Sequence, residues 1–138
     1  MDRWTCPACG REFGLARQAH TCVPGGTVEE SFAGRPAVQR AVYEAILAHL
    51  ESVGPVHVDA VGVGVFLKRR RKLAEVRPGA RRLSLVVVLP RPVAHPRVAR
   101  HLRIGADRIA HVVPLTAVEE VDEVVRDWLT QAYLVAGD

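Results

Sequence analysis

The chain has 138 residues, enough for one domain with a single core, and 49% of them are hydrophobic, which excludes an intrinsically disordered protein. No apolar run approaches the roughly 18 residues of a membrane-spanning helix, so we expect no membrane partner. The net charge of +4 conceals a basic band, because residues 68–108 carry thirteen basic and two acidic side chains, whereas residues 109–138 carry six acidic and one basic. Such a band suits either a polyanionic partner or the acidic segment of the same chain.

All three cysteines lie near the start of the chain, around one histidine. Cys6, Cys9, His20 and Cys22 have the spacing C-x2-C-x10-H-x-C, four residues of the types that bind zinc. Residues two apart share one face only in an extended segment, so the His20–Cys22 pair predicts extended backbone. Three thiolates and one imidazole would complete a closed tetrahedral site. The pattern therefore indicates one structural Zn²⁺ with no open position for catalysis.

Two other interpretations of the cysteines stay open: a redox-active C-x-x-C pair and unligated thiols. A segment of about 22 residues cannot bury enough surface to fold alone, and zinc binding, on the order of 10–16 kcal/mol in small fingers, would supply the deficit. We expect Trp4, Phe13 and Leu15 to cover the metal, and the second ring nitrogen of His20 to make an outer hydrogen bond. The polar start predicts no signal peptide, and metal-bound thiolates suit a cytoplasmic protein.

The segment Val23-Pro24-Gly25-Gly26 is a linker, which divides the chain into a zinc knuckle over residues 1–24 and an α+β domain over residues 25–138. Thr27 and Glu30 have capping-box spacing, so we expect a short helical turn ending near Phe32. A long helix opens at Pro36 and stops at Gly54-Pro55. Its expected core stripe contains Val38, Ala41, Val42, Ala45, Ile46, His49 or Leu50, and Val53.

The middle of the chain is rich in β-forming residues between turn residues. Strands are expected at 56–60, 62–67, 72–76, 82–89, 98–104 and 108–113. The strand at 82–89 is a continuous apolar run, so we expect it at the centre of the sheet and covered on both faces. The connections are too short for crossover helices, which predicts a small antiparallel β-meander.

A second long helix is expected to begin after Thr116, which has capping-box spacing with Glu119, and to end at Gly137. Its expected core stripe contains Val118, Val121, Val125, Trp128, Ala132 and either Leu129 or Tyr133. The predicted fold class is therefore α+β, a small antiparallel sheet packed by two helices, with the zinc knuckle at the N-terminus.

Three sequence motifs carry a resemblance to a known family. They are W-T-C-P-A-C-G-R-E-F at Trp4–Phe13 with Q-A-H-T-C at Gln18–Cys22, G-P-V at Gly54–Val56, and W-L-T-Q-A-Y at Trp128–Tyr133. In these motifs the chain resembles the domain-of-unknown-function family DUF5655, whose members are uncharacterised bacterial proteins. The resemblance implies the fold and a metal but no established reaction. Similar proteins tend to carry an aromatic residue where this chain has Leu73. Other copies of the domain are joined to nuclease-like modules, which favours a nucleic-acid role.

Nucleic-acid binding is the sharpest functional hypothesis. A basic hairpin would neutralise phosphates, and two arginines would extend its surface onto the knuckle. These candidate residues are Arg11, Arg17, Lys68, Arg69, Arg70, Arg71 and Lys72, with Arg77, Arg81 and Arg82 as further cations. The alternatives are a solvated hairpin in an arginine-rich proteome and a protein-interaction or small-ligand-binding adaptor without catalytic activity. The sequence does not determine the oligomeric state.

An enzyme is the weaker hypothesis. Five titratable residues could meet in space: Asp59, Glu75, His57, His101 and His111. Their order matches no known catalytic spacing, and the chain contains no G-x-S-x-G motif or phosphate-binding loop. The sequence therefore favours a protein without catalytic residues, unless a pocket brings two or more of these groups together.

Overall fold

The computed structural model describes residues 3–22, 25–62 and 64–137. The expected linker residues Val23 and Pro24 and the expected strand residue Val63 lie outside these ranges. In the described part, no helix has the length and apolar character that crossing a membrane requires.

The main sheet has six strands in the order β3-β4-β5-β6-β8-β7, and every neighbouring pair is antiparallel. Their bounds are β3 (His57–Val61), β4 (Gly64–Lys68), β5 (Lys72–Arg77), β6 (Leu83–Leu89), β7 (Arg100–Gly105) and β8 (Arg108–Leu115). The first four strands form the predicted meander. The last two strands depart from the meander order: β8, not β7, pairs with β6, and β7 forms the edge of the sheet on the far side of β8.

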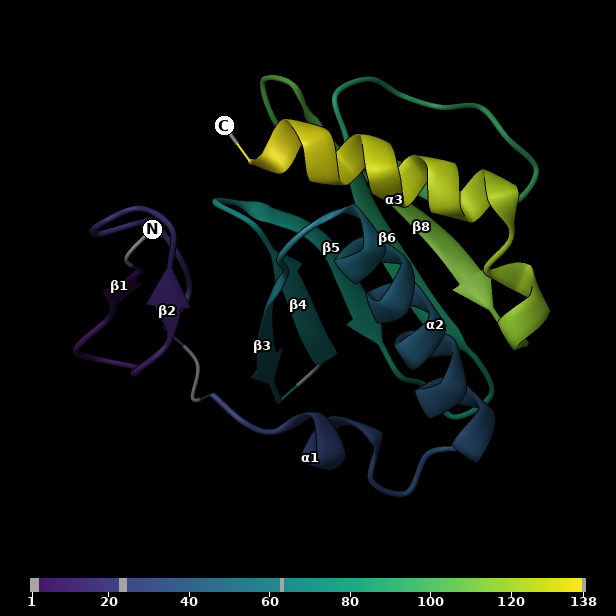
Figure 1. Ribbon diagram of the computed structural model, residues 1–138, viewed down its shortest axis with the longest axis horizontal. Coiled ribbons are helices and arrows are strands. Elements are labelled where there is room, and N and C mark those ends of the chain that lie inside the picture. The colour runs from purple at the N-terminus through teal and green to yellow at the C-terminus, as the bar shows by residue number, and fades with distance from the viewer. Residues whose placement is uncertain (1–2, 23–24, 63, 138) are drawn as a thin grey trace.

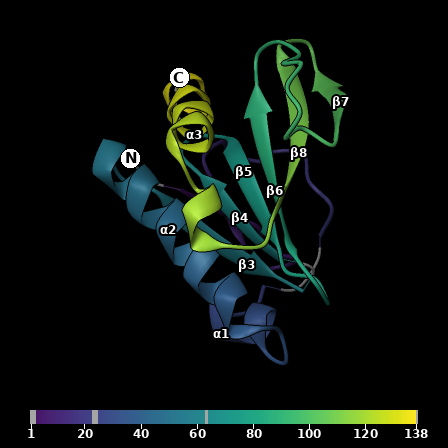
Figure 2. The same ribbon diagram turned by 90° about the vertical axis from the view of Figure 1, so that its right-hand side faces the viewer.

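Two helices, α2 (Ala37–Val53) and α3 (Glu123–Ala136), cover one face of this sheet, as the two ribbon views show (Figures 1 and 2). The short helix α1 (Val28–Phe32) begins with the predicted capping box between Thr27 and Glu30, and Phe32 is buried. Under the helices, alternate side chains of β6 are fully enclosed, from Leu83 to Leu89. The predicted α+β class with two packing helices is confirmed.

Helix α2 has the predicted bounds, and Val42, Ile46 and Leu50 of the predicted stripe are fully buried, but other positions differ. Val38 is 41% exposed and Ala41 is exposed, whereas Gln39 and Tyr43 are buried. The amide of Gln39 donates to the carbonyl of Gly79 at 2.7 Å and accepts from its N–H at 3.0 Å. A buried glutamine with both functions bonded can replace an apolar residue in the core, which is why hydrophobicity alone does not predict the burial of Gln39.

Helix α3 begins later than predicted, at Glu123. Its N-cap is Asp122, whose carboxylate accepts from the N–H of Val125 and pairs with Arg97 at 2.7 Å. The expected cap Thr116 instead bonds the side chain of Glu120, ahead of a short 3₁₀ turn, η1 (Val118–Glu120). Val118 is consequently 38% exposed, against expectation, while both alternatives for the stripe, Leu129 and Tyr133, are buried.

The second face of the sheet carries a different set of side chains. Asp59, Phe66, Glu75 and Val86 follow one another across β3, β4, β5 and β6 in register. Val86 is only half-buried, so β6 is central but lacks the complete double cover that the sequence suggested. The part of this face formed by β3 and β4 is covered by the N-terminal segment.

Candidate metal centre

The N-terminal segment is built on a two-stranded hairpin of β1 (Trp4–Thr5) and β2 (Glu12–Phe13). Between the strands, the N–H of Gly10 donates to the carbonyl of Cys6 at 2.8 Å and the N–H of Cys6 to that of Arg11 at 2.9 Å. Gly10 has φ = +74°, a conformation that glycine adopts without steric cost. This tight turn directs Cys6 and Cys9 to the same side. We call residues 3–22 the knuckle.

The four predicted ligands meet on one side of this hairpin. The ligand atoms of Cys6, Cys9, His20 and Cys22 all lie within 4.8 Å of one another. The Sγ atoms of Cys6 and Cys22 are 3.8 Å apart, and Nε2 of His20 lies 3.5 Å from the Cys9 sulfur and 3.3 Å from the Cys22 sulfur.

These separations can be compared with those of a metal tetrahedron. Zinc–sulfur bonds of about 2.3 Å and zinc–nitrogen bonds of about 2.0–2.1 Å place sulfurs about 3.8 Å apart and sulfur and nitrogen about 3.6 Å apart. The three separations above agree with these values to within about 0.3 Å. The residues therefore fit a four-coordinate ion, and the donor set is the soft one that zinc shares with few other metals.

His20 is held in the orientation that a ligand needs. Its Nδ1 lies 2.6 Å from the carbonyl oxygen of Gln18, which leaves Nε2 free to face the sulfurs. Phe13 stacks on the imidazole with 4.0 Å between ring centroids, and Trp4 meets the edge of the same ring at 6.3 Å. The expected outer hydrogen bond is present, and two of the three expected covering residues, Trp4 and Phe13, pack on His20. The third, Leu15, is half-buried, and its N–H donates to the side chain of Gln18.

The thiols have unequal acidities without a metal. A hydrogen bond from the backbone of Cys9 lowers the pKa of Cys6 to about 6. The hydrogen bond with Cys6, together with burial, raises the pKa of Cys22 to about 11. Three sulfurs this close cannot all ionise beside one another, and a divalent cation among them would remove that restriction.

A buried ionic cluster fixes the knuckle to the sheet. Asp59 on β3 accepts hydrogen bonds from Arg11 of the knuckle at 3.1 Å and from Lys68 of β4 at 2.7 Å. The three side chains are 8%, 4% and 4% exposed, respectively. Burial alone would raise the pKa of Asp59, but the hydrogen bonds from Lys68 and Arg11 outweigh it and hold the pKa below its usual value. The cluster has two cations for one carboxylate.

Further contacts join the knuckle to the β4–β5 turn. Arg3 donates to the carbonyl oxygen of Arg69 at 2.8 Å. The amino group of Lys68 lies 4.2 Å from the centroid of the Phe13 ring. Gly14 packs against the carbonyl of Arg70 so closely that a β-carbon there would overlap it. The knuckle and this hairpin therefore form one continuous surface.

The predicted nucleic-acid residues separate into two groups. Arg11 and Lys68 are buried and bound to Asp59, and Arg69 lies over the Tyr133 ring and donates to the Tyr133 carbonyl at the end of α3. Arg70 and Arg71 are exposed at the hairpin tip, as predicted, and Arg17 is exposed on the knuckle. Lys72 is half-buried and pairs with Glu75 at 3.1 Å.

The five residues considered for catalysis do not form one site. Asp59 is bound by Arg11 and Lys68, and Glu75 by Lys72 and Arg77. His111 is fully buried, accepts from the N–H of Val93 and stacks on His101 at 5.7 Å. Along their strands, Asp59 and Glu75 alternate with the residues that are in register with His111. Because successive side chains of a strand point to opposite faces, the two carboxylates lie on one face of the sheet and the histidine pair lies on the other.

The comparison with known proteins agrees with this fold. The family model described as Domain of unknown function (DUF5655) matches residues 28–136. The chain belongs to this family. The match covers α1 to α3, so the motifs at Gly54–Val56 and Trp128–Tyr133 lie inside it, whereas the knuckle with its motif at Trp4–Phe13 lies outside it. No curated protein and no solved structure matches the chain.

The spacing correctly predicts that Cys6, Cys9, His20 and Cys22 come together, but it does not indicate the ionic cluster that holds the knuckle in place. Asp59, a catalytic candidate by residue type, instead binds Arg11 and Lys68, which by charge alone resemble phosphate contacts. A carboxylate alternating with apolar residues in a strand is a sign of burial with a partner, and that pattern is visible in His57–Val61.

Proposed function

We propose that the metal is zinc and that its role is structural. The sulfur–sulfur and sulfur–nitrogen separations support this proposal most directly, because they suit a closed S₃N tetrahedron with no position for a substrate or water. The metal would fold residues 1–24 as one unit, and Arg11 would hold that unit against the domain over residues 25–138. Thiolates of this kind persist in a reducing compartment, so we place the protein in the cytoplasm.

We further propose that the protein is not an enzyme but binds nucleic acid through the surface shared by the knuckle and the β4–β5 hairpin. The supporting observation is that docking of the knuckle gathers arginines from distant parts of the sequence at one end of the sheet. Arg3, Arg69 and Arg70 line a hollow of about 270 Å³ there, and among residues 3–22, 25–62 and 64–137 no carboxylate lines it. The exposed Arg71 lies beside this hollow on the same turn. Such unpaired positive charge is what a phosphate backbone requires.

The test is a binding titration with duplex and single-stranded DNA and RNA across a salt series. Arg70→Ala with Arg71→Ala removes two exposed cations without disturbing the buried cluster. We expect weaker binding to all sequences, and a plot of log K against log salt whose slope becomes shallower by about 1.4 to 1.8.

A matched control is available on the same sheet. Arg81 and Arg82 are also two exposed neighbouring arginines, but they lie on the β5–β6 turn, at the opposite end of the strands. Arg81→Ala with Arg82→Ala should leave affinity and slope nearly unchanged. Equal effects of the two double variants, or binding without salt dependence, would contradict this proposal.

The alternative of a protein-interaction adaptor has one supporting observation. The edge strand β7 exposes Leu102 by 67% and Ile104 by 46%, beside half-buried Val112 of β8. An exposed apolar edge strand can pair with another chain. Size-exclusion chromatography with light scattering tests this alternative, since Leu102→Lys would convert a dimer to a monomer and leave a monomer unchanged.

A further inference from the structure

A groove of about 420 Å³ separates the knuckle from the second face of the sheet. One wall is the knuckle, including Phe13 and the proposed ligand His20, and the other is formed by Phe66, Lys72, Ile104 and Arg108 of the sheet. Its volume lies within the range of small-ligand sites in proteins. Because the walls come from three separate parts of the chain, the groove exists only when the knuckle is docked.

The groove is positively charged. Four cations line it, Arg11, Lys68, Lys72 and Arg108, and within the described part of the chain none of the lining residues is acidic. Arg11 and Lys68 share the single carboxylate of Asp59, so the floor retains one positive charge. This environment favours an anion.

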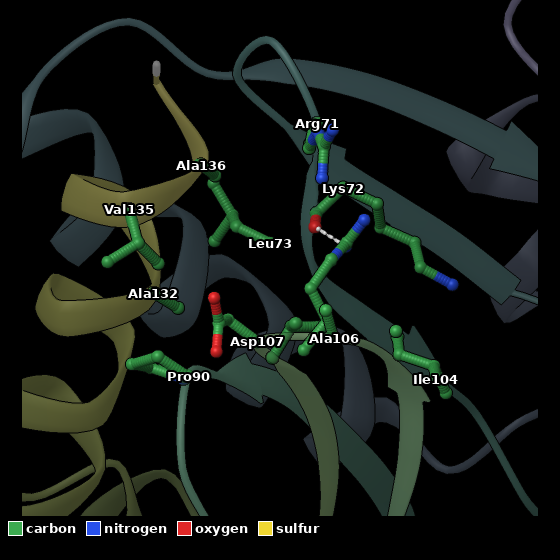
Figure 3. A pocket seen from close by; sticks show the side chains of 13 residues that line it. Arg71, Lys72, Leu73, Pro90, Ile104, Ala106, Asp107, Ala132, Val135 and Ala136 are labelled. Atoms are coloured by element: carbon green, nitrogen blue, oxygen red, sulfur yellow. Dashed lines mark hydrogen bonds between the residues drawn. The ribbon is translucent and has the colours of Figure 1, made fainter.

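Arg108 is the cation best placed to meet a ligand. Among the described residues it makes no ion pair, and its guanidinium is fixed by donating to the carbonyl of Lys72 at 2.7 Å, the dashed line in Figure 3. Burial and the neighbouring Arg71 both lower the pKa of Arg108, as expected for a cation that lacks a counter-ion. The bond joins Arg108 to the backbone of Lys72, whose own ammonium lines the groove but pairs with Glu75 at 3.1 Å and lies 4.6 Å from the centroid of the Phe66 ring. Arg108 is therefore the cation of the groove wall that has no carboxylate partner among the described residues.

The larger hollow on the other side of this bond is a poorer anion site. It measures about 640 Å³ and lies between α3 and the β7–β8 turn, with the carboxylate of Asp107 in its wall (Figure 3). The groove differs from it in having aromatic walls, Phe13 and Phe66, and no carboxylate. Ile104, 46% exposed, adds an apolar surface beside Phe66.

We propose that the groove between the knuckle and the sheet binds a nucleotide, with its phosphate at Arg108 and its base against Phe66 and Ile104. The ligand chemistry is that of a phosphate monoester on a flat apolar body, and its source is either a free mononucleotide or the phosphorylated end of a strand. The proposal rests on the proposed metal site, which forms one wall, and does not require the hairpin-tip arginines Arg70 and Arg71.

The test is calorimetric titration of the zinc-loaded protein with AMP, ribose 5-phosphate and inorganic phosphate. We expect AMP to bind, and removal of the base to weaken binding by about tenfold, the effect of losing roughly 55 Å² of apolar contact. Arg108→Gln keeps a donor for the Lys72 carbonyl and should weaken AMP binding by about tenfold or more. Arg91→Gln makes the same charge change on an exposed loop outside the groove and should have no effect.

Four further experiments test the proposal. Ile104→Ser should weaken AMP binding while leaving ribose 5-phosphate unaffected. Chelation of the metal should abolish AMP binding, and the Arg70→Ala, Arg71→Ala variant should retain it. If a 5′-phosphorylated oligonucleotide competes with AMP and its unphosphorylated form does not, the natural ligand is the phosphorylated end of a strand. If neither oligonucleotide competes, the natural ligand is a free nucleotide. No AMP binding at about 1 mM, or binding that ignores Arg108 or the metal, overturns the proposal.

Discussion

Replacing Asp59 by asparagine tests the buried cluster that joins the knuckle to the sheet. The side chain keeps its shape but loses its charge, so the cations of Arg11 and Lys68 are left buried without a counter-ion. Breaking a buried pair in this way costs about 3–5 kcal/mol, because the desolvated charge remains while its attraction is lost. For a chain of 138 residues this corresponds to a fall in Tm of roughly 10–20 °C.

Urea unfolding of the metal-loaded protein, followed by circular dichroism and tryptophan fluorescence, measures this loss. Glu44→Gln is the control, since it removes the same charge from an exposed pair with Arg40 and should cost less than about 1 kcal/mol. Asp59→Asn combined with Lys68→Met should recover part of the stability by removing one unpaired cation. A free energy of unfolding for Asp59→Asn within about 1 kcal/mol of the wild-type value would refute the reasoning.

Three other predictions concern the packing and the pH dependence. Burial lowers the pKa of His111 below 6.5, so on acidification the unfolded chain takes up this proton before the folded protein does. The free energy of unfolding should therefore fall as the pH drops below about 6.5. His111→Gln should make this pH dependence shallower in unfolding measured as a function of pH. Gln39→Ala leaves both backbone groups of Gly79 without their partner and should cost about 1–3 kcal/mol in urea unfolding, whereas exposed Val38→Ala should cost under about 1 kcal/mol. Gly14→Ala should push the knuckle away from the Arg70 carbonyl and weaken nucleic-acid binding, while elemental analysis finds the metal content unchanged. Gly10→Ala strains the turn between Cys6 and Arg11 itself and should lower the affinity for the metal.

The sequence was sufficient for the features that depend on local patterns. The clustering of Cys6, Cys9, His20 and Cys22 follows from their spacing. Turn and capping chemistry within a few residues predicts the capping box at Thr27, the end of α2 at Gly54 and the Arg69–Arg71 turn. The order of the first four strands follows from their short connections.

The remaining features depend on contacts between distant residues. Nothing local indicates that Gln39 bonds Gly79, and this bond accounts for the burial of Gln39 on the first turn of α2. The start of α3 moved because Asp122 both caps the helix and meets Arg97, 25 residues earlier in the chain. The charge of Arg11 and Lys68 pointed to an external polyanion, whereas a single distant carboxylate, Asp59, binds both of them. Charge counts do not reveal such pairing.

The central claim is that one zinc ion holds the knuckle, and elemental analysis of the purified chain beside Cys9→Ser tests it most directly. Cys9 contributes one of the three sulfurs within 4.8 Å of the other ligands, so its loss opens the tetrahedron. The account predicts one zinc per wild-type chain and a chain largely without metal for the variant. A wild-type protein that folds without metal, or a variant that keeps its full zinc content, would contradict it.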